Sequence, residues 1–153
     1  MVGIDKPIER LRTRLNEKLS WVTAYGRCYR NEKEDGIKPE VYIGDNNYKD
    51  VLHDNTENRC FFDVVNRGSF IANMSTAVVD VIFIVNIEET GVEGRDTEAL
   101  HAEVMNVIED IEVFKLDSLS TGSDALTAFA AGTEKFHPWY TFKFTCNVNF
   151  YYC

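Results

Sequence analysis

A long alternation of apolar and polar residues in the segment Trp139–Cys153 sets the strongest limit on the fold of this chain. The even positions are apolar and mostly aromatic: Tyr140, Phe142, Phe144, Cys146, Val148, Phe150 and Tyr152. The odd positions between them are polar: Thr141, Lys143, Thr145, Asn147 and Asn149. Because a β-strand directs successive side chains to opposite faces, this pattern predicts one long strand with its apolar face toward a core. At about 3.4 Å per residue it would span roughly 45 Å, so we expect it to bend or to run past the domain toward a partner.

The segment Thr76–Ile87 predicts a second long strand, placed centrally in the sheet. One face is wholly apolar: Ala77, Val79, Val81, Phe83, Val85 and Ile87. The other face mixes apolar and polar side chains: Val78, Asp80, Ile82, Ile84 and Asn86. Apolar residues on both faces indicate cover on both sides over part of the strand. A salt bridge or a partner's backbone amide would explain the carboxylate of Asp80 in this apolar run.

Shorter β-prone segments indicate the remaining strands, at 23–29, 40–43, 48–52, 60–65 and 113–119. The segment 44–47, Gly-Asp-Asn-Asn, has turn composition and predicts a hairpin between the strands that flank it. The segment Ser120–Lys135 is rich in small and polar residues. A connection of this length in a compact domain usually has a function, or becomes ordered when a partner binds.

Two amphipathic helices are predicted from apolar stripes of helical period. The first covers residues 6–20, with Asp5 as N-cap and Pro7 in the first turn. Its outer face is largely basic: Arg10, Arg12, Arg14, Glu17 and Lys18. That face would suit an acidic neighbour, although a solvated helix face is the simpler interpretation. The second helix covers residues 96–111, with Asp96 as N-cap.

The order of these elements is helix, several strands, helix and strand. It predicts one α+β domain over residues 1–153, with a mostly antiparallel β-sheet and the two amphipathic helices packed on it.

The chain is acidic, with 16 Lys and Arg against 25 Asp and Glu and a formal net charge of −9. This balance argues against binding to bare nucleic acid, which needs clustered cations, and against anionic membrane surfaces. The start of the sequence, MVGIDKPIERLR, lacks a basic-then-apolar leader, and the longest apolar run, Val81–Val85, is far shorter than a membrane span. We therefore expect a soluble protein made in the cytoplasm.

No constellation of residues indicates chemistry, so we expect no catalytic, cofactor or metal site and no enzymatic activity. The three histidines are isolated, without a second ligand at metal spacing: His53, His101 and His137. The four cysteines form no CxxC pair and are expected to be small apolar residues: Cys28, Cys60, Cys146 and Cys153. The chain has no P-loop, GxGxxG, GxSxG or HExxH motif. The enzymatic alternative would need carboxylates that assemble only in three dimensions.

The segments taken together resemble small structural proteins of tailed bacteriophages, in the tail-terminator, tail-completion and neck group. The likeness is greatest to versions in phages and prophages of Bacteroidetes. It rests on the N-terminal helix Ile4–Leu19, KPEVYIGDNNYKDVLHD at 38–54, RCFFDVV at 59–65, AVVDVIFIVNIEE at 77–89, the helix at 96–111, and HPWYTFKFTCNVNFYYC at 137–153.

This resemblance implies a virion protein of the tail or neck that is synthesised in the cytoplasm of the bacterial host. It implies a tail-terminator-like subunit of a closed ring, a hexamer or alternatively a dodecamer. The ring would cap the tail tube and join it to the portal or neck. Expected partners are further copies of the chain and the portal, adaptor or tail-tube proteins, with DNA passing through the lumen without specific binding and no contact with a membrane.

Such proteins act through surfaces, so no functional residue is carried over from the family. The candidate surfaces are the terminal strand with its tip at 151–153, the basic helix face and the segment 120–135. We expect Phe142→Asp or Phe144→Asp to prevent folding, and Thr145→Asp or Asn147→Lys to fold but to block assembly. The alternative function is a bacterial, non-enzymatic adaptor or binding domain that adds a partner's strand to a sheet edge.

Overall fold

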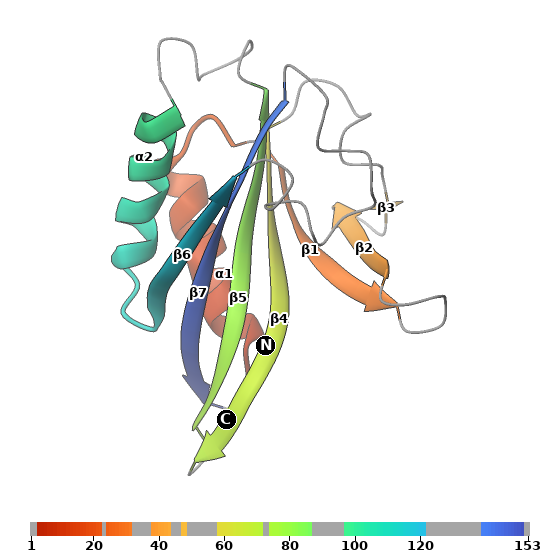
Figure 1. Ribbon diagram of the computed structural model, residues 1–153, viewed down its shortest axis with the longest axis vertical. Coiled ribbons are helices and arrows are strands. Elements are labelled where there is room, and N and C mark those ends of the chain that lie inside the picture. Colours follow the sequence, from red (N-terminus) through yellow and green to blue (C-terminus); the bar gives the residue numbers. More distant parts are fainter. Residues whose placement is uncertain are drawn as a thin grey trace.

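One mixed β-sheet with two helices on one of its faces makes up the computed structural model (Figure 1). The structure describes residues 3–22, 24–31, 38–43, 47–48, 58–71, 74–86, 97–121 and 139–151. The elements in chain order are α1 (Asp5–Lys18), β1 (Ala24–Asn31), β2 (Lys38–Ile43), β3 (Asn47–Tyr48), β4 (Arg59–Ile71), β5 (Met74–Asn86), α2 (Thr97–Glu109), β6 (Phe114–Thr121) and β7 (Trp139–Tyr151). The predicted α+β class is therefore confirmed.

The described strands form a 7-stranded sheet in the order β3-β2-β1-β4-β5-β7-β6. The pair β1–β4 is parallel, and the other neighbours run antiparallel. The strand β5 pairs along its whole length with β7, from Met74↔Tyr151 to Asn86↔Trp139. The strand predicted at 76–87 therefore has an internal position, as expected, and the two strongest strand patterns of the sequence lie side by side.

The main core lies between the sheet and the two helices. The odd residues of β5 from Ala77 to Val85 point into it and are almost fully buried. The same holds for the even residues of β7 from Phe142 to Phe150. The rings of Phe83 and Phe142, which are register partners, stack with centroids 4.9 Å apart. The helices contribute their predicted stripes: Ile4, Ile8, Leu11, Leu15, Leu19 and Val22 from around α1, and Leu100, Val104, Val107, Ile108 and Ile111 from around α2.

The face of the sheet that points away from the helices is here called the outer face, and only one half of it is buried. The buried half includes Phe61, Ile82, Ile84 and Thr141. Toward the other ends of the same strands, the outer-face side chains of Thr76, Asn147 and Asn149 are exposed. The prediction that β5 is covered on both sides over part of its length is therefore confirmed.

Two details of the prediction were wrong. The N-cap position of α1 is Ile4, with no side-chain cap hydrogen bond, and Asp5 lies in the first turn. The carboxylate of Asp5 instead accepts a hydrogen bond from Arg27 of β1 at 2.8 Å, so a tertiary ion pair replaces the local cap. The strand predicted at 60–65 continues to Ile71, with irregular register between Val64 and Asn66.

Several predictions fall on residues outside the described ranges. They concern the hairpin turn at 44–46, most of the strand at 48–52, the cap Asp96, the segment 122–135 and the tip residues Tyr152 and Cys153. For the hairpin, the structure does describe the strands β2 and β3 as an antiparallel pair.

Candidate interaction surfaces

A buried polar cluster occupies the middle of the outer face. The ammonium Nζ of Lys143 lies 3.6 Å from Oδ2 of Asp80, and the hydroxyl of Thr145 donates a hydrogen bond to Oδ1 of Asp80 at 2.8 Å. The side chains of Lys143 and Asp80 are only 11% and 10% exposed. Asp63, also buried, is the register partner of Asp80 on β4. A salt bridge to Lys143 therefore accounts for the buried carboxylate of Asp80. This is one of the two explanations that the sequence suggested.

This cluster changes the interpretation of the polar face of β7. Thr141 and Lys143 are buried and Thr145 is partly buried, so these residues stabilise the subunit. Thr145→Asp, which the sequence suggested would fold but block assembly, is now expected to destabilise the subunit as well, because the new carboxylate would lie against Asp80. Among the odd residues of β7 whose burial the structure describes, Thr141 to Asn149, only Asn147 and Asn149 are exposed to a partner.

The open end of the outer face carries exposed polar side chains, which we call the polar patch: Thr76, Lys115, Asn147 and Asn149. The register places Lys115 opposite Asn147, and Thr76 opposite Asn149. Three neighbouring strands therefore hold the patch on a rigid, hydrogen-bonded frame. Its amide and hydroxyl groups can form hydrogen bonds to a partner with less desolvation than charged groups require.

The strand β6 forms an edge of the sheet. Within the ranges that the structure describes, β6 pairs with β7 on one side and with no strand on the other. Most of its side chains are exposed, including Leu119 at 41%. An edge with unpaired backbone groups can accept a further strand.

The basic face of α1 separates into paired and unpaired cations. Arg12 forms an ion pair with Glu9 at 2.7 Å, and Arg14 lies 3.3 Å from Glu17 and 3.4 Å from Asp110 of α2. By contrast, Lys6 and Arg10 are exposed, and no carboxylate of the described residues forms an ion pair with either of them.

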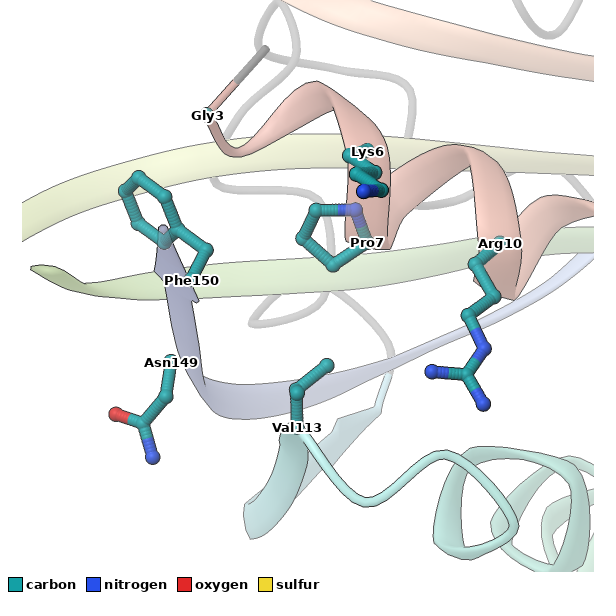
Figure 2. Close-up of a pocket in the computed structure, with 7 residues that line it drawn as sticks. All are labelled: Gly3, Lys6, Pro7, Arg10, Val113, Asn149 and Phe150. Carbon is teal, nitrogen blue, oxygen red and sulfur yellow. The ribbon is translucent and has the colours of Figure 1, made fainter. Parts of the chain in front are cut away.

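Lys6 and Arg10 border a cavity of about 360 Å³, which we call the notch (Figure 2). It is lined by Gly3, Lys6, Pro7, Arg10, Val113, Asn149 and Phe150. These residues come from the start of α1, the connection between α2 and β6, and the end of β7. Gly3 has a φ of 61°, a region that favours glycine. The notch joins parts of the chain that are far apart in sequence, so no local pattern could have predicted it.

His101 of α2 looks isolated in the sequence, as a surface or packing histidine, and the structure gives it a specific partner. Its Nε2 lies 2.8 Å from the hydroxyl of Tyr140, and its ring meets that of Phe142 edge-on with centroids 4.8 Å apart. Burial lowers the pKa of His101, although the carboxylate of Glu98 acts in the opposite direction. The folded protein therefore favours the neutral imidazole.

We predict that folding stability falls as the pH drops below about 6.5, the ordinary pKa of histidine, because the unfolded chain then takes up a proton that the folded His101 resists. The loss of stability ends once the pH is below the lowered pKa of His101 in the folded state. Above about pH 6.5, His101 does not make the folding stability depend on pH. Urea unfolding between pH 7.5 and 5 should show that the free energy of unfolding depends less on pH in His101→Gln than in the wild type. The matched variant His53→Gln should retain the dependence due to His101, and equal slopes for His101→Gln and the wild type would contradict the prediction.

The remaining candidates for chemistry are the cysteines and any cluster of metal-ligating side chains. Cys60 and Cys146 are buried thiols, and burial raises the pKa of Cys146 to about 12, so it stays protonated. Among the described residues no group of three or more His, Cys, Asp or Glu side chains is arranged to hold a metal ion. No described helix combines the length and the apolar composition needed to cross a membrane.

No family model, no curated protein and no solved structure matches this chain. Function therefore has to be inferred from the chemistry of the surfaces themselves.

Proposed function

We propose that this protein is a virion structural protein that forms a ring at the head–tail junction or the tail end of a tailed bacteriophage. In this role it caps the tail tube and joins it to the portal or neck around the DNA channel. Its partners are further copies of the chain, with portal, adaptor or tail-tube proteins at the two sides of the ring. The starting point is the resemblance of its sequence segments to tail-terminator, tail-completion and neck proteins.

The observation that carries the proposal is the half-covered outer face of the sheet. The strands β4, β5 and β7 each have 13 residues, so the outer face is long. One half of this face is covered and contains buried charges, and the other half carries the polar patch. A rigid, polar and largely uncharged surface of this kind suits contact between subunits, because the frame loses little conformational entropy when it is covered. This favours a protein that works by assembly.

The acidic balance of the chain is compatible with DNA passing through the ring. A protein with a net charge of −9 has few cations with which to displace the counterions of phosphates. Repulsion between like charges would keep DNA from adhering to the lumen. The ring would then guide DNA without binding it specifically.

We predict that Asn147→Lys leaves the fold intact but reduces assembly of particles at least about tenfold, because it buries an unpaired charge in the contact. The matched control is Asn16→Lys, the same change at an exposed position of α1. Thermal unfolding should show both variants within a few degrees of the wild type. Complementation of a phage that lacks the gene should then separate them, and equal particle yields would remove the polar patch from the contact surfaces.

The location in the particle tests the function directly. An epitope-tagged chain, supplied during phage production, should be seen by immunoelectron microscopy at the head–tail junction or the tail end. Imaging of the particles should also show it as a closed ring. Particles that contain no tagged protein, or that carry it in the head shell, would overturn the proposal.

The second candidate function is a bacterial adaptor domain that adds a partner's strand to β6. The specific observation in its favour is the edge position of β6 with its exposed side chains. Under this alternative, replacing Leu119 by proline, which removes a backbone N–H directed away from β7, should abolish partner binding and leave particle assembly unaffected.

A further inference from the structure

The notch has the chemistry of a receptor for an apolar side chain that is flanked by carboxylates. Its walls include Pro7, Val113 and Phe150, and its border carries Lys6 and Arg10. In Figure 2 the ring of Phe150 and the side chain of Val113 lie on one side of the opening, and the two cations project from α1 on the other. Because neither cation has a carboxylate partner among the described residues, an incoming acidic group would meet two available charges.

The outer side of α2 carries the complementary chemistry, which we call the α2 stripe: Glu98, Ala102, Met105 and Glu109. These positions follow the helical spacing of four, three and four residues, so they share one face, opposite the buried stripe of α2. All of them are exposed, and Met105 is one of three exposed large apolar side chains among the described residues. An apolar side chain thus lies between two carboxylates.

We propose that the notch of one subunit receives Met105 from a second copy of this chain, with Lys6 and Arg10 against the carboxylates of that copy's α2 stripe. The inference rests on the proposed function, since a ring of one chain needs two different and complementary patches on every subunit. Charge selects the occupant: in a chain with a net charge of −9, the notch is bordered by cations and the α2 stripe by carboxylates.

The physical contribution of each part of this contact differs. Methionine is unbranched and flexible, so it adapts to an irregular apolar cavity. The ion pairs lie at the rim, where they orient the two subunits and speed association more than they add affinity. We therefore expect the self-association to weaken as the salt concentration rises from about 0.05 to 0.5 M, because exposed ion pairs are screened.

The test compares the self-association of full-length variants by sedimentation velocity. Arg10→Glu and Glu109→Lys should each weaken it roughly tenfold or more, because each places like charges in contact. An equimolar mixture of these two variants should restore it, since the reversed charges become complementary. The matched control for Arg10→Glu is Lys18→Glu on the same helix, away from the notch, and it should associate like the wild type.

The apolar part is tested separately. Met105→Ser should weaken association, whereas Leu119→Ser, the same kind of change at an exposed position of β6, should not. Unfolding followed by circular dichroism checks that each variant is folded.

The outcomes separate this inference from the proposed function. If the wild type forms rings and Arg10→Glu associates as well as Lys18→Glu, the docking contact is wrong and the ring stands. If the charge-reversal pair behaves as expected but assembly stops at a dimer, the docking contact stands and the ring is wrong. A wild type that stays monomeric at all concentrations overturns the docking contact, and imaging of the particles then decides the function by itself.

Discussion

Replacing Phe142 by aspartate is expected to abolish folding. The side chain of Phe142 is fully buried, it stacks on Phe83, and it contacts the rings of His101 and Phe144. An aspartate there would remove these contacts and bury a charge without a partner, at an expense of at least about 5 kcal/mol. This is comparable to the whole stability of an ordinary domain, about 5 to 15 kcal/mol, so the variant should be insoluble or lack a cooperative unfolding transition.

Two further variants of the same strand make this prediction specific. Phe142→Leu keeps the site apolar and should cost clearly less, about 1 to 3 kcal/mol, for the lost ring contacts and the small cavity. Asn147→Asp introduces the same carboxylate on the exposed outer face, and it should change the stability by less than about 0.5 kcal/mol. A soluble Phe142→Asp protein with a cooperative thermal transition would show that this face of β7 is not the core.

Replacing Lys143 by methionine is expected to have the second largest effect, a loss of about 3 kcal/mol. The variant keeps the volume of the side chain but leaves the buried carboxylate of Asp80 without its ion-pair partner, while Asp63 faces it across the strands. Removing one member of a buried ion pair typically destabilises a protein by about 3 to 5 kcal/mol, because an uncompensated charge remains.

A double-mutant cycle measures how much of this loss belongs to the pair. Asp80→Asn and Lys143→Met should each destabilise the protein in urea unfolding, and the double variant should be less destabilised than the sum of the two by about 2 kcal/mol. Strictly additive effects would show that Lys143 stabilises the outer face by a route other than Asp80.

The sequence predicted the regular part of this fold well, because periodicity reports which side of a strand or helix is buried. The even residues of β7 and the stripes of both helices lie in the core as predicted. The alternation did not reveal how much of the odd face of β7 is covered. Thr141 and Lys143 lie in register with Ile84 and Ile82 of β5 and are buried, and Asp80, the ion-pair partner of Lys143, lies on another strand.

The misses have the same physical origin, which is competition between local and tertiary partners. Asp5 has the composition of a helix cap, but the guanidinium of Arg27 provides a stronger, charge-assisted hydrogen bond. His101 looks isolated in sequence because its partner Tyr140 belongs to a distant strand. The notch depends on the meeting of Gly3, Val113 and Phe150, which only the folded chain brings together.

The internal position of β7, between β5 and β6, has a consequence for the order in which the protein can be made. β7 is the last of the described elements to leave the ribosome, yet it supplies one whole neighbour of β5 and the ring that stacks on Phe83. Until β7 emerges, the nascent chain carries an apolar β5 with one unpaired edge, a state prone to aggregation. The chain therefore cannot fold in step with its translation, and truncation before Trp139 should yield a protein that depends on chaperones to remain soluble.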